Sequence, residues 1–61
     1  SDSTDAQAYN NYAYSLAERN KNIQLALELA QNAIRLEPKS APYLDTVGWI
    51  YFKFITYIYI S

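Results

Sequence analysis

Apolar residues recur every three or four positions between residues 23 and 34, and this spacing constrains the fold more than any other feature. The residues that share it are Ile23, Ala26, Leu27, Ala30, Ala33 and Ile34. Side chains with this spacing lie on one face of an α-helix, so the pattern predicts a helix over about 22–36. Pro38 ends it, because proline disfavours the helical conformation in the residue before it and has no amide hydrogen to donate.

A second stripe with the same period precedes the first. Its members are Tyr9, Tyr12, Ala13, Leu16 and Ala17. They predict a helix over about 5–19 that is capped by Thr4 or Asp5. The spacing of Thr4 and Gln7 fits a capping box, in which the two side chains satisfy backbone groups of the first turn. Residues 1–4 are expected to form a disordered N-terminal end.

Residues 20–22 (Asn-Lys-Asn) favour a short turn, because an asparagine side chain competes for backbone hydrogen bonds and can cap the following helix. A third helix is expected over about 41–57, with Ser40 as its cap and Pro42 in its first turn. Its stripe consists of Leu44, Val47, Gly48 and Tyr51. Glycine costs about 1 kcal/mol relative to alanine inside a helix, so Gly48 indicates the close approach of another helix.

Residues 54–61 form an apolar tail that has both helical spacing and high β propensity. We expect the helix to continue to about Tyr57, since elongation is easier than nucleation. Three interpretations of the tail are open: a helical cap or oligomer contact, an edge or cross-β segment that is prone to aggregation, and a membrane-surface contact. The low charge and the lack of proline fit a cross-β segment. The lysine-rich polar face of an interfacial helix is missing, which argues against a membrane partner.

The size and charge of the chain limit what it can do. A chain of 61 residues buries about 60% of the surface that it exposes when unfolded, so its core is small. The absence of cysteine excludes disulfides and thiolate zinc sites. The net charge of −1, with five cationic residues spread along the chain, argues against nucleic-acid binding. Association with other helices remains as a source of stability.

Residues that usually perform catalysis are nearly absent. The chain has no histidine or cysteine, and its six acidic residues form no catalytic motif and no metal-ligand spacing. Ser15 and Ser40 have no general base near them in the sequence. We therefore expect no enzymatic activity, no metal and no cofactor.

The ends of the chain suggest its origin and compartment. It begins at Ser1 and contains no methionine, so we expect a processed or excised piece of a longer protein. The N-terminus lacks the pattern of a secretory signal. The apolar segment 47–60 is shorter than the roughly 20 residues of a membrane span. The sequence does not determine the compartment, and we favour the cytoplasm.

Two helices of about 14 residues, joined by a tight turn and followed by a proline and a new helix, have the layout of a 34-residue repeat. With one extra residue in the first turn, residues 5–40 resemble a complete tetratricopeptide-repeat (TPR) hairpin of the bacterial type. The residues that match are Tyr9, Tyr12, Ala13, Leu16, Ala26, Ala33 and Pro38. Ala30 departs from the family, which usually has an aromatic residue there.

Residues 41–53 resemble the first helix of a second, truncated repeat. The residues that match are Leu44, Val47, Gly48 and Tyr51. Beyond Lys53 the resemblance ends, because the family would place a polar turn there. The resemblance implies an all-α fragment of three helices, in which one helix-turn-helix hairpin is followed by the first helix of the next repeat.

The resemblance also implies a scaffold for protein–protein interaction. In the family, a peptide or partner protein binds in the groove formed by the first helices of successive repeats. The matching positions here are Asn10, Tyr14, Ala17, Asp45, Trp49 and Phe52. The alternative is that the aromatic members only pack against a neighbouring repeat or subunit. Asp45 and Thr46 depart from the members that clamp a C-terminal carboxylate, so we expect no such clamp.

The alternative function is self-assembly. Three or more repeats are normally needed for independent stability, and the third helix here would leave a face uncovered. Each large side chain that stays exposed forgoes roughly 1.5 to 3 kcal/mol of burial. We therefore expect a homo-oligomer, formed by packing or exchange of the third helix. The candidate contacts are Tyr51, Phe54, Ile55 and Ile58.

Overall fold

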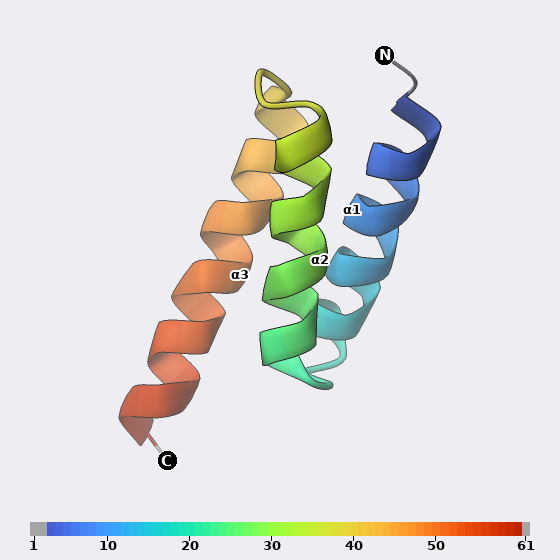
Figure 1. Ribbon diagram of the computed structural model, residues 1–61. Helices are drawn as coiled ribbons and strands as arrows, with labels where there is room; N and C mark the ends of the chain where they lie inside the picture. Colours follow the sequence, from blue (N-terminus) through green and yellow to red (C-terminus); the bar gives the residue numbers. More distant parts are fainter. Residues whose placement is uncertain (1–2, 61) are drawn as a thin grey trace.

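The computed structural model describes residues 3–60, which form three α-helices joined by two short turns. The helices are α1 (Ser3–Glu18), α2 (Ile23–Leu36) and α3 (Ala41–Ile60). α2 lies between the other two and packs against both, whereas α1 and α3 share a smaller contact (Figure 1). The described part contains no strand and measures 39 × 17 × 13 Å. The predicted all-α fold of three helices is confirmed.

α1 begins earlier than the sequence predicts. It starts at Ser3, so Thr4 and Asp5 lie within its first turn, and the prediction that one of them precedes the helix as its cap is wrong. Ala6 in the same turn is fully buried. Residues 3 and 4 are therefore helical and not a disordered end, while residues 1 and 2 lie outside the described part of the chain.

α1 ends at an asparagine in the left-handed region of the backbone. Asn20 has a φ of 54°, and its amide donates to the carbonyl of Ala17 at 3.0 Å. The amide of Lys21 donates to the carbonyl of Leu16 at 2.9 Å. These two bonds define a Schellman motif, in which glycine is the usual left-handed residue and asparagine the next best.

Side chains cap the other two helices as predicted. Asn22, with a φ of 47°, starts α2, and its Oδ1 accepts a hydrogen bond from the amide of Leu25 at 3.2 Å. The Oγ of Ser40 accepts one from the amide of Tyr43 at 3.3 Å, which caps α3. Each bond satisfies a backbone donor that has no partner inside the helix. These local signals explain why the predicted boundaries of α2 and the start of α3 agree with the structure.

Alanine makes up half of the core cluster. Its members are Ala13, Leu16, Ala17, Ile23, Ala26, Leu27, Ala30 and Ile50. Small side chains allow α1 and α2 to approach closely, and the branched ones fill the remaining space. α3 contributes Ile50, which is the largest fully buried side chain among residues 3–60.

α3 packs through a face that the sequence pattern does not predict. It buries Thr46 and Ile50, whereas most of the predicted stripe is exposed. Thr46 can be buried because its hydroxyl donates to the carbonyl of Pro42 at 3.0 Å. The apolar residues of α3 lie all round the helix, so spacing alone could not identify the packed side.

Gly48 does not lie at a close approach between helices of this chain. It is exposed, and a Cβ built on it would meet no described atom within 4 Å. The prediction of close approach at Gly48 is therefore wrong within the described molecule, because the side of α3 that carries this residue faces solvent.

The apolar tail is helical. α3 continues to Ile60, three residues beyond the predicted end, and Ser61 lies outside the described residues. Residues 54–60 extend an established helix without a break, as expected when elongation is easier than nucleation. The strand conformation of the tail is contradicted for these residues.

Candidate protein-binding groove

An aromatic pair joins the first and third helices. Tyr14 of α1 and Trp49 of α3 lie with ring centroids 4.9 Å apart and planes tilted by 34°. This distance is within the range of favourable aromatic contacts. Both side chains remain exposed at the surface, so they can still contact another molecule.

The pair lines a shallow hollow between α1 and α3. The hollow has a volume of about 250 Å³ and is lined by Tyr14, Asp45, Thr46 and Trp49. Asp45 lies one helical turn before Trp49 and is exposed. Asp45 is the one charged side chain among the described residues that line this hollow.

Lys53 contacts the same tryptophan. Its Nζ lies 5.2 Å from the centroid of the Trp49 ring, within cation–π distance. The two residues are four positions apart in α3, and this spacing brings their side chains together on one face of the helix. The sequence analysis missed this contact, although the spacing could have revealed it.

Asn10 lies one turn before Tyr14 on α1. It is half-buried, and its Oδ1 is buried without a hydrogen-bond partner in the described part of the chain. An unpaired buried acceptor costs free energy, so this side chain would gain from a donor group. Asn10 is thus close in sequence to the aromatic pair but does not line its hollow.

The structure brings together part of the predicted groove. Tyr14, Asp45 and Trp49 surround one hollow. Ala17 is fully buried in the core, so its assignment to the groove is wrong. Phe52 is exposed and lines a different hollow of about 370 Å³ at the C-terminal end of α3. The hollow between α1 and α3 therefore contains fewer of the predicted residues than the family pattern implies.

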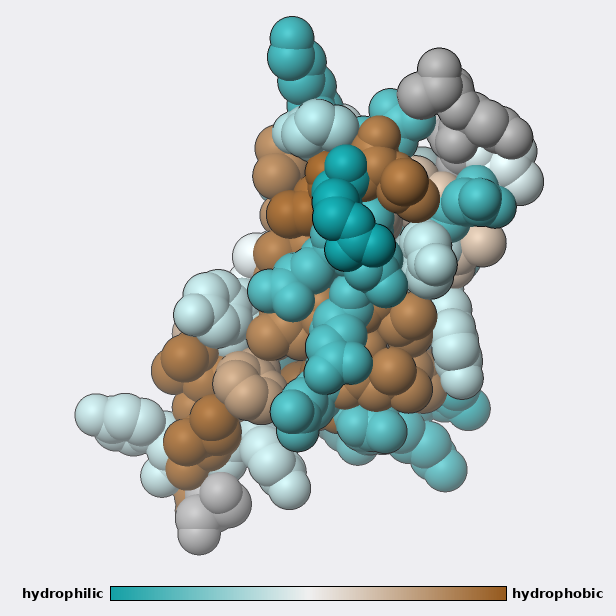
Figure 2. Space-filling view, in the orientation of Figure 1, coloured by the Kyte–Doolittle hydropathy of each residue, from teal (hydrophilic) through white to brown (hydrophobic). Residues whose placement is uncertain are grey.

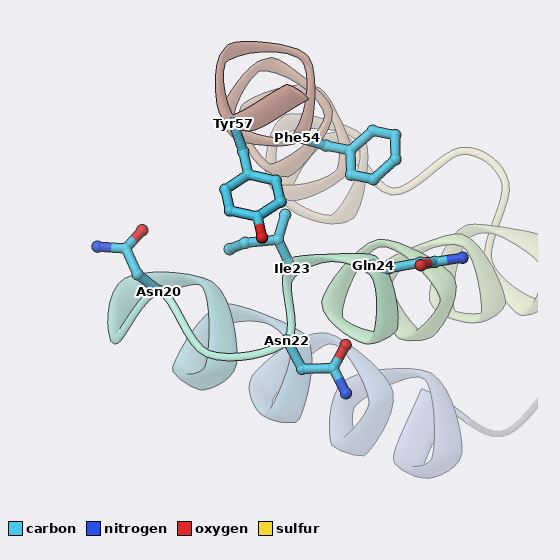
Figure 3. A pocket seen from close by; sticks show the side chains of 6 residues that line it. All are labelled: Asn20, Asn22, Ile23, Gln24, Phe54 and Tyr57. Atoms are coloured by element: carbon cyan, nitrogen blue, oxygen red, sulfur yellow. The ribbon is translucent and has the colours of Figure 1, made fainter. Parts of the chain in front are cut away.

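A further hollow lies where the α1–α2 turn meets α3. It has a volume of about 210 Å³ and is lined by Asn20, Asn22, Ile23, Gln24, Phe54 and Tyr57. Figure 3 shows Tyr57 projecting from α3 toward Ile23 of the turn, with the carboxamides of Asn20 and Asn22 on either side. The sequence pattern identified the asparagines only as turn and capping residues. It missed the hollow because the position of α3 over the turn is a tertiary feature.

The predicted self-association residues fall into two groups. Tyr51, Ile55 and Ile58 are exposed on α3. Phe54 is half-buried and packs against the core, so it is not available as an exposed contact. These placements leave three of the four predicted side chains at the surface.

The described residues lack a candidate metal site and a candidate membrane span. They contain no group of three histidine, cysteine, aspartate or glutamate side chains that could hold a metal ion. None of the three described helices has both the length and the hydropathy required to cross a membrane. The arrangement can present aromatic, carboxylate and carboxamide groups to another molecule.

Comparisons with known proteins give no match, either to a protein-family model or to a curated protein or solved structure.

Proposed function

We propose that this chain is a TPR-like interaction module, a scaffold piece that binds a peptide or partner protein without catalysing a reaction. The site is the hollow between α1 and α3. The observation that carries the proposal is the contact of Tyr14 with Trp49 beside the carboxylate of Asp45. Aromatic side chains held by rigid helices provide large contact areas at a small entropic cost.

The chemistry of the hollow favours a particular kind of ligand. An apolar or aromatic side chain would contact the exposed rings of Tyr14 and Trp49. A lysine or arginine beside it would pair with Asp45, the one charged residue that lines the hollow. The preferred ligand is therefore a peptide in which a basic residue neighbours an apolar one.

The experiment is a selection of random heptapeptides displayed on phage against the immobilised full chain. We expect the selected sequences to be enriched in basic residues beside aromatic or aliphatic ones. Synthetic copies of the selected peptides are then titrated into wild-type, Trp49→Ala and Asp45→Asn chains by calorimetry. Each substitution should weaken binding by about ten-fold or more, as expected for a central contact.

Tyr12→Ala is the matched control. Tyr12 is an exposed tyrosine of α1 that lines another hollow with Asp5 and Leu29, so its removal should leave peptide affinity unchanged. Selection no better than on a surface without protein would contradict the proposal. So would selected peptides that bind equally well to the Trp49→Ala and Asp45→Asn chains.

A further inference from the structure

The side of α3 that points away from α1 and α2 is apolar along most of its length. We call it the outward face of α3, and it consists of Leu44, Gly48, Tyr51, Phe52, Ile55 and Tyr59. Phe52 lies at its edge, where it also lines a hollow with Asn20 and Ile23. With about 100° of rotation per residue, these positions fall within an arc of about 100° that contains no charged residue. Thr46 and Ile50, which are buried, lie on the opposite side of the helix.

Such an apolar face is unusual on the side of a helix that is exposed to water. Four of the five exposed positions of α2 carry polar residues, namely Gln24, Glu28, Gln31 and Arg35, and the fifth is Leu36 at its end. A helix that is apolar on all sides is normally buried on all sides. Figure 2 shows hydrophobic residues, interspersed with residues of weakly hydrophilic character, along the α3 side of the molecule. The outward face of α3 is therefore expected to be covered.

The exposed area is of the size that a dimer needs. Tyr51, Phe52 and Tyr59 are 54%, 69% and 90% exposed. With about 200 Å² per aromatic side chain, these three expose roughly 400 Å². Leu44 and Ile55, also exposed, bring the total to roughly 600 Å², most of the roughly 800 Å² that each partner buries in a standard interface.

A second copy of the same face fits in an antiparallel register. With a two-fold axis between Tyr51 and Phe52, every member of the outward face meets another member in the second copy. The pairs are Leu44 with Tyr59, Gly48 with Ile55, and Tyr51 with Phe52. The open space at Gly48 would accommodate the Ile55 side chain of the second copy, in the manner of knobs-into-holes packing. Antiparallel helices also place opposite dipole ends side by side.

The α1–α2 hairpins do not obstruct this arrangement. They pack on the side of α3 that carries Thr46 and Ile50, so they would lie on the outer sides of the helix pair. The contact would also give Gly48 a role. Glycine weakens a helix, and no packing contact inside the described chain compensates for this cost.

We propose that the outward face of α3 is a symmetric interface, at which two copies of this chain pack their third helices antiparallel. The inference goes beyond the binding groove, since none of the residues of the outward face lines the hollow between α1 and α3. A symmetric interface closes at two copies, which predicts a dimer and no larger species.

Sedimentation equilibrium of the full chain tests the interface with two matched substitutions. Tyr51→Lys and Tyr12→Lys both replace a tyrosine that is about half exposed, 54% and 53% respectively. Tyr51→Lys should raise the dimer dissociation constant by about ten-fold or more, and Tyr12→Lys should leave it unchanged. Far-UV circular dichroism checks that both variants remain helical.

The Gly48→Leu variant distinguishes a specific interface from non-specific hydrophobic association. Leucine forms helices better than glycine and adds apolar surface, so the variant should fold and non-specific association should increase. In the proposed register its side chain would occupy the space that receives Ile55. We therefore expect Gly48→Leu to dissociate the dimer.

Cysteine cross-linking tests the register, because the natural chain has no cysteine. Under oxidising conditions, a mixture of Gly48→Cys and Ile55→Cys chains should form a disulfide-linked dimer, and each variant alone should not. Self-linking of each variant alone would contradict the antiparallel register. A monomer at all concentrations, a dimer that survives both Tyr51→Lys and Gly48→Leu, or assembly beyond the dimer would overturn the proposal.

Discussion

Tyr14 and Trp49 hold the first and third helices together through a ring contact of 4.9 Å. α1 and α3 otherwise share only a small contact, since α2 lies between them. The pair therefore has two roles. It stabilises the position of α3, and it leaves exposed ring surface beside Asp45 for a ligand.

A double-mutant cycle measures the strength of this contact. Tyr14→Leu, Trp49→Leu and the double variant are compared by urea unfolding, followed by far-UV circular dichroism at low protein concentration. We expect a coupling free energy of about 1 kcal/mol, because an aromatic pair contributes about that much beyond its buried area. The same cycle with Tyr12→Leu in place of Tyr14→Leu should be additive. Additivity of both cycles would show that the ring contact contributes nothing.

Ile50→Ala should unfold the chain. Ile50 is fully buried, and truncating such a side chain typically costs about 2 to 5 kcal/mol. That loss is comparable with the total stability of roughly 3 to 9 kcal/mol expected for a chain of this size. Thermal unfolding by circular dichroism at low protein concentration should show no cooperative transition. Ile55→Ala, at an exposed position of the same helix, should keep its transition, and equal behaviour of the two would contradict this packing of α3.

Gly48→Ala should stabilise the isolated chain by about 1 kcal/mol. Its φ is not positive, and the added methyl group would meet no described atom within 4 Å, so nothing offsets the better helix propensity of alanine. The free energy of unfolding is measured at low protein concentration, where a dimer would be dissociated. A lower stability would mean that Gly48 packs against part of the same chain.

The conformation of Asn20 predicts opposite responses to two substitutions. Its φ of 54° suits glycine, so Asn20→Gly should leave the stability unchanged or slightly higher. Asn20→Ala should lower it by about 1 kcal/mol, because the β-carbon of alanine clashes in this backbone region. Urea unfolding of the two variants, compared with the wild type, checks both values. A tolerated Asn20→Ala would show that the Schellman motif is not required.

Local features of the chain predicted the helices well. The stripe from Ile23 to Ile34, the cap at Asn22 and the cap at Ser40 act over a few residues each, and all three appear in the structure. The N-terminal boundary was less accurate, because α1 begins at Ser3, before the residues that were predicted to cap it.

The candidate site was predicted only in part. Tyr14, Asp45 and Trp49 lie together, but Ala17 belongs to the core and Phe52 lines another hollow. A spacing pattern gives the angular position of a residue around its own helix. It does not show how far neighbouring helices cover that position.

The sequence by itself determined roughly where the three helices lie along the chain and which side chains cap α2 and α3, because helical periodicity and capping act between near neighbours. The tertiary structure alone decided which side of α3 is packed. Apolar residues surround that helix, so its orientation depends on the fit of Thr46 and Ile50 against the α1–α2 hairpin. The same fit brings Tyr14 to Trp49 and leaves Gly48 at the surface.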